Sequence, residues 1–131
     1  MDSTRKMLLR WVPAVLWMAA IFGLSATPGN DLPQFGSLDY LLKKSGHILG
    51  YAILGLAFRW ALDWGKRRYV PAWLLAIGYA LFDEWHQSFV AGRHPSLLDA
   101  FGFDALGAAA ALWLSSKWSR PVSPSSGANP D

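Results

Sequence analysis

Four apolar stretches, each close to the length of a membrane-crossing helix, constrain the fold of this chain more than any other feature. The stretches run approximately over residues 8–26, 44–63, 70–90 and 97–117. A helix of about 20 apolar residues crosses a hydrocarbon core of about 30 Å. The segments between them are a Pro/Gly turn after the first stretch, a short basic loop after the second and a Gly/Pro loop after the third. The sequence therefore predicts an all-α, polytopic membrane protein, a four-transmembrane-helix bundle.

We expect a single folded domain. Residues 8–117 make up the transmembrane domain, and the Pro/Ser/Gly-rich residues 118–131 are typical of a disordered cytoplasmic tail. The first stretch also resembles a secretory signal peptide, because basic residues precede it and small residues end it at Ser25 and Ala26. No soluble domain follows it, so we expect a retained span.

The composition also indicates a lipid environment. The chain is 53% hydrophobic and only 16% charged, whereas a soluble domain carries about 25% charged residues. It has no cysteine, which excludes disulfides and thiolate metal sites. The formal net charge of +3 does not indicate nucleic acid, because the basic residues flank the apolar stretches instead of forming a stripe with interleaved aromatics.

Basic residues in the short loops predict the orientation, because Lys and Arg concentrate on the cytoplasmic side. Nine of the twelve basic residues fall on one side of the predicted bundle: Arg5, Lys6, Arg10, Arg59, Lys66, Arg67, Arg68, Lys117 and Arg120. Both termini should therefore be cytoplasmic, in the cytoplasmic (inner) membrane of a bacterium. The other three, Lys43, Lys44 and Arg93, face the extracytoplasmic side.

Three polar clusters interrupt the apolar stretches, at residues 43–47, 83–87 and 92–99. Charge within a membrane is expensive and is usually functional. With the predicted orientation, all three clusters lie in the outer half of the bilayer. Lys44, His47 and Tyr51 are spaced by three and four residues and so share one helical face, as do Glu84 and Gln87. We expect the clusters to converge on one site.

Small residues indicate close helix packing. Gly46 and Gly50 form a GxxxG pattern, and the fourth stretch is rich in Gly and Ala. This composition fits tight packing around a narrow polar cavity, and it fits plain structural packing equally well. A homodimer is compatible with the pattern.

In this order, the motifs resemble the VanZ-like family of small integral membrane proteins. The matching positions are Lys44, His47, Tyr51, Leu54, Asp83, Glu84, Gln87, Phe89, Gly92, Arg93, Ser96, Asp99 and Gly107. The resemblance covers roughly residues 10–116 and implies an integral membrane protein. The family takes its name from a resistance trait against the lipid-tailed glycopeptide teicoplanin.

One departure from the family pattern concerns Asp104. The family usually places a second Asp or Asn four residues after the motif Asp, with Gly three residues later. Here Asp104 follows Asp99 by five residues, which is about 140° around an α-helix instead of about 40°. Either a bulge restores the register or Asp104 has a different role.

The residue types suit a lipid-linked or phosphate-bearing substrate of the cell envelope, such as a membrane lipid or a lipid-linked glycan. As catalytic residues we expect His47 and Glu84, acting as an acid/base pair. The expected substrate-binding residues are Lys44, Tyr51, Gln87, Arg93 and Ser96. Asp83 and Asp99 would support the site by holding His47 or Arg93 in place. Hydrolysis or group transfer in the outer leaflet is the reaction class that these residues favour.

Other interpretations remain open. The charged residues can form an ion-pair network that only ties three helices together. A non-enzymatic factor that binds a lipid-linked precursor or a lipophilic glycopeptide would need the cations without the acid/base pair. A metal held by His47 with Glu84 or Asp99 and a proton relay in a small transporter are further alternatives. We expect no metal and no other cofactor, and we interpret His86 and His94 as interfacial or loop residues.

Overall fold

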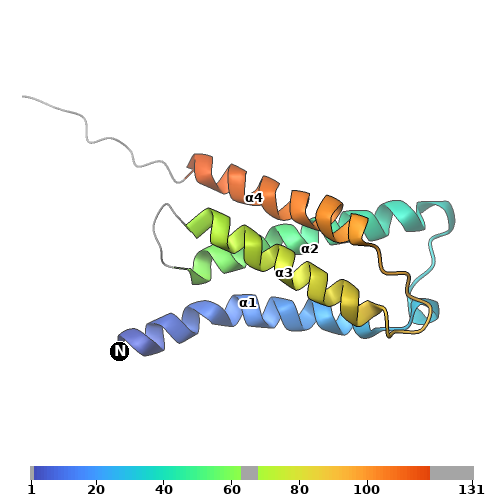
Figure 1. Ribbon diagram of the computed structural model, residues 1–131, viewed down its shortest axis with the longest axis horizontal. Coiled ribbons are helices and arrows are strands. Elements are labelled where there is room, and N and C mark those ends of the chain that lie inside the picture. The colour runs from blue at the N-terminus through green and yellow to red at the C-terminus, as the bar shows by residue number, and fades with distance from the viewer. Residues whose placement is uncertain (1, 63–67, 119–131) are drawn as a thin grey trace, which may run out of the picture.

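The computed structural model describes residues 2–62 and 68–118 and contains only helices in those ranges (Figure 1). The long helices are α1 (Ser3–Ala26), α2 (Asp39–Ala61), α3 (Tyr69–Gln87) and α4 (Ala105–Trp118). Two short 3₁₀ turns, η1 (Gly29–Asp31) and η2 (Gly36–Leu38), connect α1 to α2, and a π-helical segment, η4 (Asp99–Asp104), leads into α4. The prediction of an all-helical chain with four long helices is confirmed for these residues.

The helix ends differ from the predicted limits by a few residues. α1 begins at Ser3, ahead of the apolar stretch, and it ends at Ala26 because Pro28 favours the extended conformation that Thr27 adopts. α2 begins at Asp39 instead of Lys44. α3 ends at Gln87 instead of Val90. Most of the expected basic loop, residues 63–67, and most of the expected tail, residues 119–131, lie outside the described residues.

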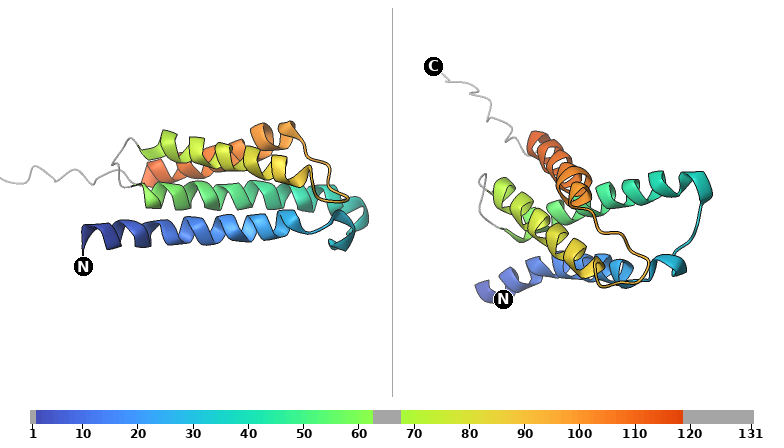
Figure 2. Two further views of the ribbon diagram at one scale, coloured as in Figure 1. Left: turned by 60° about the horizontal axis from the view of Figure 1, so that its bottom comes forward. Right: turned by 45° about the vertical axis from the view of Figure 1, so that its right-hand side comes forward.

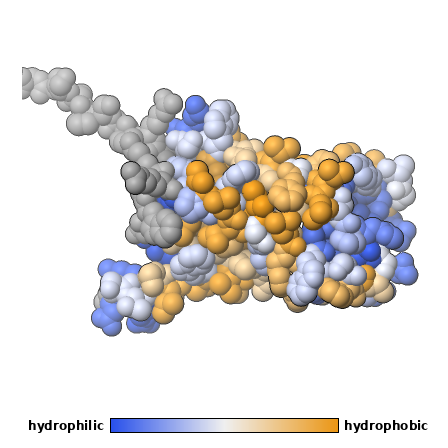
Figure 3. Space-filling model, viewed as in Figure 1, coloured by the Kyte–Doolittle hydropathy of each residue, from blue (hydrophilic) through white to orange (hydrophobic). Residues whose placement is uncertain are grey.

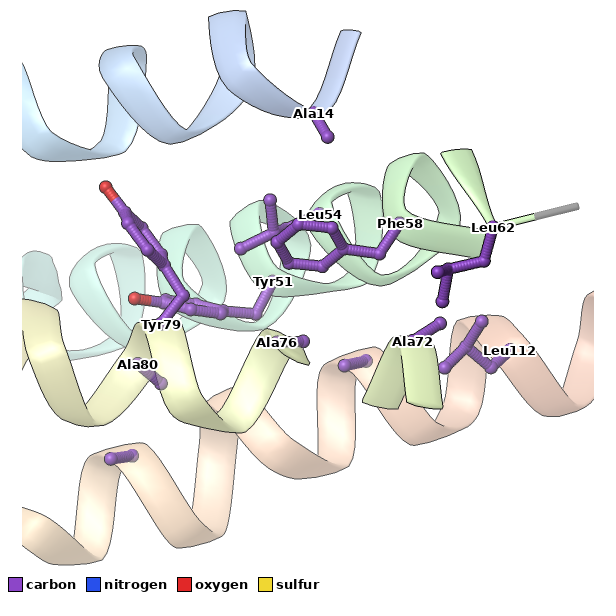
Figure 4. Close-up of a cluster of buried hydrophobic side chains, with 12 residues drawn as sticks. Ala14, Tyr51, Leu54, Phe58, Leu62, Ala72, Ala76, Tyr79, Ala80 and Leu112 are labelled. Atoms are coloured by element: carbon purple, nitrogen blue, oxygen red, sulfur yellow. The ribbon is translucent and has the colours of Figure 1, made fainter. Parts of the chain in front are cut away.

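The four helices lie side by side, and α2 contacts each of the other three (Figures 1 and 2). A buried cluster runs between them, with Leu54 and Phe58 of α2 at its centre (Figure 4). Aromatic side chains also form hydrogen bonds between helices. Trp17 Nε1 donates to the Gly50 carbonyl at 2.8 Å, and Tyr79 Oη donates to the Met18 carbonyl at 2.6 Å. These bonds hold α1 against both α2 and α3.

Small residues set the distance between α2 and α4. A Cβ atom on Gly107 would overlap the backbone of Ile48, and one on Gly55 would lie 3.2 Å from the Cβ of Ala108. By contrast, Gly46 and Gly50 face open space, with no atom within 4 Å of where their Cβ atoms would lie. Within the described residues, the GxxxG pattern of α2 therefore brings no other helix backbone close to α2, and Gly50 contacts α1 only through the Trp17 side chain at its carbonyl.

Two loops pack together at the end of the bundle that holds the start of α2 (Figure 1). The amide of Gly29 donates to the Ala91 carbonyl at 3.0 Å. Gly92 has a φ of +70°, a conformation that suits glycine, and a Cβ atom on Gly29 would overlap the Gly92 carbonyl. This contact joins the connection after α1 to the connection after α3, so all three polar clusters meet at the same end.

Apolar side chains cover the middle of the face shown in Figure 3, and polar side chains gather toward its ends. Large hydrophobic residues are exposed on every long helix, for example Leu16, Leu49, Leu74 and Leu106. By length and composition, one helix of the described residues, α1, qualifies as a membrane span, with 24 residues and a mean hydropathy of 1.8 over an 18-residue stretch.

Candidate functional site

Two pairs of side chains link α2 to η4. Lys44 Nζ forms an ion pair with Asp99 Oδ1. One turn further along α2, His47 Nδ1 donates to Asp104 Oδ1 at 3.0 Å, and the Asp104 side chain is only 1% exposed. The carboxylate that holds His47 is therefore Asp104, whereas the sequence pointed to Asp83 or Asp99 for that role.

The π-helical segment explains how both aspartates can face α2. In a π-helix the backbone hydrogen bonds run from i to i+5, so residues five apart come into approximate register. Asp99 and Asp104 are the first and last residues of η4. On a regular α-helix they would diverge by about 140°. Of the two explanations open at the sequence level, the structure shows the bulge that restores the register.

Asp83 gathers donors from three helices. Its Oδ2 accepts hydrogen bonds from Ser25 Oγ at 2.7 Å, Gln87 Nε2 at 3.0 Å and Tyr51 Oη at 3.5 Å. Gln87 Nε2 also donates to Ser25 Oγ at 3.2 Å. Asp83 is 2% exposed, and its Oδ1 has no hydrogen-bond partner among the described residues. Ser25 was not predicted as a site residue. The only feature of the sequence that could have indicated it is a hydroxyl side chain at the end of an apolar stretch.

Glu84 is also buried, at 5% exposure, but its hydrogen bond goes to the loop after α3 instead of to the other helices. Its Oε2 accepts a hydrogen bond from the backbone amide of Ser96 at 2.7 Å. Ser96 precedes the helical turn that leads into η4, so Glu84 satisfies a free amide at a helix start. No hydrogen bond joins Glu84 to His47 among the described residues.

Arg93 binds the C-terminus of α1. Its Nε donates to the Thr27 carbonyl at 3.0 Å, and its Nη2 donates to the Leu24 carbonyl. Carbonyls at a helix C-terminus lack intrahelical partners and attract cations. Two of the three guanidinium nitrogens of Arg93 thus already have backbone acceptors, so less of the fork is open to a phosphate than the sequence suggested.

A pocket of about 450 Å³ lies between α1 and α2, with part of α3 as its floor. Five of the predicted site residues line it: His47, Tyr51, Asp83, Gln87 and Arg93. The other four, Lys44, Glu84, Ser96 and Asp99, do not line it and form the contacts described above. Apolar side chains form the walls, and Gly46 and Gly50 leave space along α2.

The remaining histidines lie elsewhere. The ring of His86 stacks on Phe22 with the ring centres 4.2 Å apart, and His94 is exposed in the loop after α3. Among the described residues, no group of three or more His, Cys, Asp or Glu side chains is arranged to hold a metal ion.

The site can orient an imidazole against an amphiphilic ligand. With Nδ1 bonded to a buried carboxylate, the other ring nitrogen, Nε2, is the one left to accept a proton.

A family model, VanZ/LLP1, matches residues 7–119 of the chain. No match was found among curated proteins or among solved structures.

Proposed function

The chain belongs to the VanZ/LLP1 family, and from this premise we propose that it is an integral membrane protein that acts on a lipid-linked, phosphate-bearing substrate of the cell envelope. α1, α2, α3 and the continuous helix formed by η4 and α4 span the cytoplasmic membrane. Both termini are cytoplasmic, and the pocket opens in the outer half of the bilayer. The length and hydropathy of α1, the exposed leucines on every long helix and the distribution of basic residues support this arrangement.

The character of the pocket supports an amphiphilic substrate. Trp17 and Ile21 of α1 and Leu49 and Ile53 of α2 give it apolar walls, where a lipid tail can lie. Lys43 and Arg93 supply positive charge on the same pocket. A phosphate is the group that both kinds of cation bind well.

The observation that carries the catalytic part of the proposal is the His47–Asp104 pair beside this pocket. His47 Nε2 accepts the proton of an attacking water or hydroxyl as its oxygen bonds to phosphorus. The phosphorus–oxygen bond to the leaving group then breaks, and the leaving oxygen takes that proton from His47. Asp104 keeps the ring oriented and stabilises the imidazolium, while Glu84 anchors the Ser96 loop.

The test is a mass-spectrometric survey of membrane lipids and lipid-linked glycans in cells that make matched amounts of each protein. We expect the wild type to add or remove a species that His47→Ala and Asp104→Asn leave unchanged. His94→Ala is the matched control, because His94 is an exposed histidine outside the pocket. Glu84→Gln should keep the activity, because its amide oxygen still accepts from Ser96. Loss of activity in Glu84→Gln would instead indicate that Glu84 acts as an acid or base, as the sequence predicted.

A non-enzymatic binding function is the second candidate. The observation in its favour is that Lys44 and Arg93 already have partners within the protein, so part of the polar cluster serves as structural support. Identical lipid profiles in all variants, together with retained binding of a lipid-linked precursor or lipophilic glycopeptide, would support this candidate over catalysis.

A further inference from the structure

Asp83 has one carboxylate oxygen with three hydrogen-bond contacts and one with none. Ser25, Tyr51 and Gln87 all donate to Oδ2, whereas Oδ1 accepts nothing from the described residues. The side chain is 2% exposed, and an unpaired buried acceptor carries its full desolvation cost. Asp83 lines the pocket, but Oδ1 itself is enclosed, so a donor on a pocket ligand supplies the missing bond once the side chains around the carboxylate shift to admit it.

We propose that Asp83 Oδ1 is the acceptor for a hydroxyl or ammonium group on the ligand, so that the pocket selects an amphiphile whose head group carries a hydrogen-bond donor beside its phosphate. The inference rests on the proposed lipid-linked substrate and specifies its head group. A polyol head, such as glycerol or a sugar, and an amine head, such as ethanolamine, share this chemistry.

The rest of the pocket orients such a molecule. Arg93 and Lys43 place positive charge for the phosphate, and Gln87 Nε2 donates to one oxygen of the Asp83 carboxylate, which holds the other in the position of Oδ1. The open space beside Gly46 and Gly50 gives the tail a path along α2. The head donor therefore enters toward α3 while the tail lies between α1 and α2.

The experiment measures lipid binding to the purified full-length protein in detergent by native mass spectrometry. The probes are dioleoyl phosphatidylglycerol, phosphatidylethanolamine and phosphatidylmethanol, and the last carries the phosphate diester without a head-group donor. We expect phosphatidylglycerol or phosphatidylethanolamine to bind about tenfold more tightly than phosphatidylmethanol, the size of effect typical of a hydrogen bond to a charged acceptor. The tighter of the two identifies the hydroxyl or the ammonium as the donor.

Asp83→Asn tests the residue itself. The donors on Oδ2 hold the amide oxygen of the new side chain in that position, which turns its NH₂ group toward the place of Oδ1. The variant should therefore lose the tenfold preference while it still binds phosphatidylmethanol. Asp31→Asn is the matched control, because Asp31 is exposed in η1 and does not line the pocket, and it should keep the preference.

Gly50→Leu separates this inference from the proposed function. A Cβ atom at Gly50 meets no neighbour, so a leucine there extends into the pocket that Gly50 lines, and Gly23→Leu is the matched control outside the pocket. Equal binding of all three lipids, abolished by Gly50→Leu, would overturn the role of Asp83 and leave the pocket in place. If no lipid binds, or if Gly50→Leu binds all three like the wild type, the lipid pocket itself is wrong.

Discussion

At the scale of single residues, the coupling free energy between His47 and Asp104 tests the contact on which the proposed role of His47 as a base depends. Asp104 is 1% exposed and bonds His47 at 3.0 Å, so each side chain compensates the burial of the other. In a double-mutant cycle with His47→Ala and Asp104→Ala, we expect a coupling free energy of about 0.5–3 kcal/mol. The measurement is SDS-induced unfolding in mixed micelles.

The control cycle pairs His47→Ala with Asp39→Ala, because Asp39 bonds Lys43 on its own helix. That cycle should show additive effects, since additivity holds for residues without shared partners. Additive effects for His47 and Asp104 as well would contradict the pairing and would remove the main support for His47 as a base.

At the scale of elements, the π-helical segment η4 behaves as a one-residue insertion in a helix. Deleting Gly102 shortens the spacing between Asp99 and Asp104 from five residues to four, which on an α-helix turns them only about 40° apart. We therefore expect the deletion to keep both links to α2, with the free energy of unfolding within about 1.5 kcal/mol of the wild type, the range of well-tolerated core changes.

Deleting Ala109 is the matched control. It lies in the regular part of α4, where losing a residue rotates every later side chain by about 100° relative to α2. This deletion should destabilise the bundle strongly, as measured by the same unfolding assay. Equal destabilisation by both deletions would mean that η4 stabilises the bundle by more than turning Asp99 and Asp104 toward α2.

The same segment shows where prediction from the sequence ends. The apolar stretches and the order of motifs predicted the helices and the approach of the polar clusters to one end, because these depend on composition and on the 3.6-residue period. Lys44 was expected to bind substrate, and its ion pair with Asp99 matches the alternative of an ion-pair network between helices. The link from His47 to Asp104 was not predictable, because the register of η4 depends on its packing against α2 and α3, which the sequence alone does not give. The role of Gly46 and Gly50 was equally open, since a GxxxG pattern does not say which surface it faces.

At the scale of the whole molecule, the absence of cysteine makes the proposed topology directly testable. With four spans and cytoplasmic termini, Asn30 in η1 and His94 lie outside the membrane, while Ser3 and Arg68 lie on the cytoplasmic side. A membrane-impermeant maleimide added to intact cells should label Asn30→Cys and His94→Cys and spare Ser3→Cys and Arg68→Cys.

Permeabilised cells are the control, and there all four variants should react. Labelling of Arg68→Cys together with Asn30→Cys and His94→Cys in intact cells would mean that α2 and α3 do not both cross the membrane. The reverse pattern, with Ser3→Cys labelled and Asn30→Cys protected, would place the pocket on the cytoplasmic side. A substrate would then come from the inner leaflet, because the His47–Asp104 pair and the pocket lie at the end of the bundle that carries Asn30 and His94.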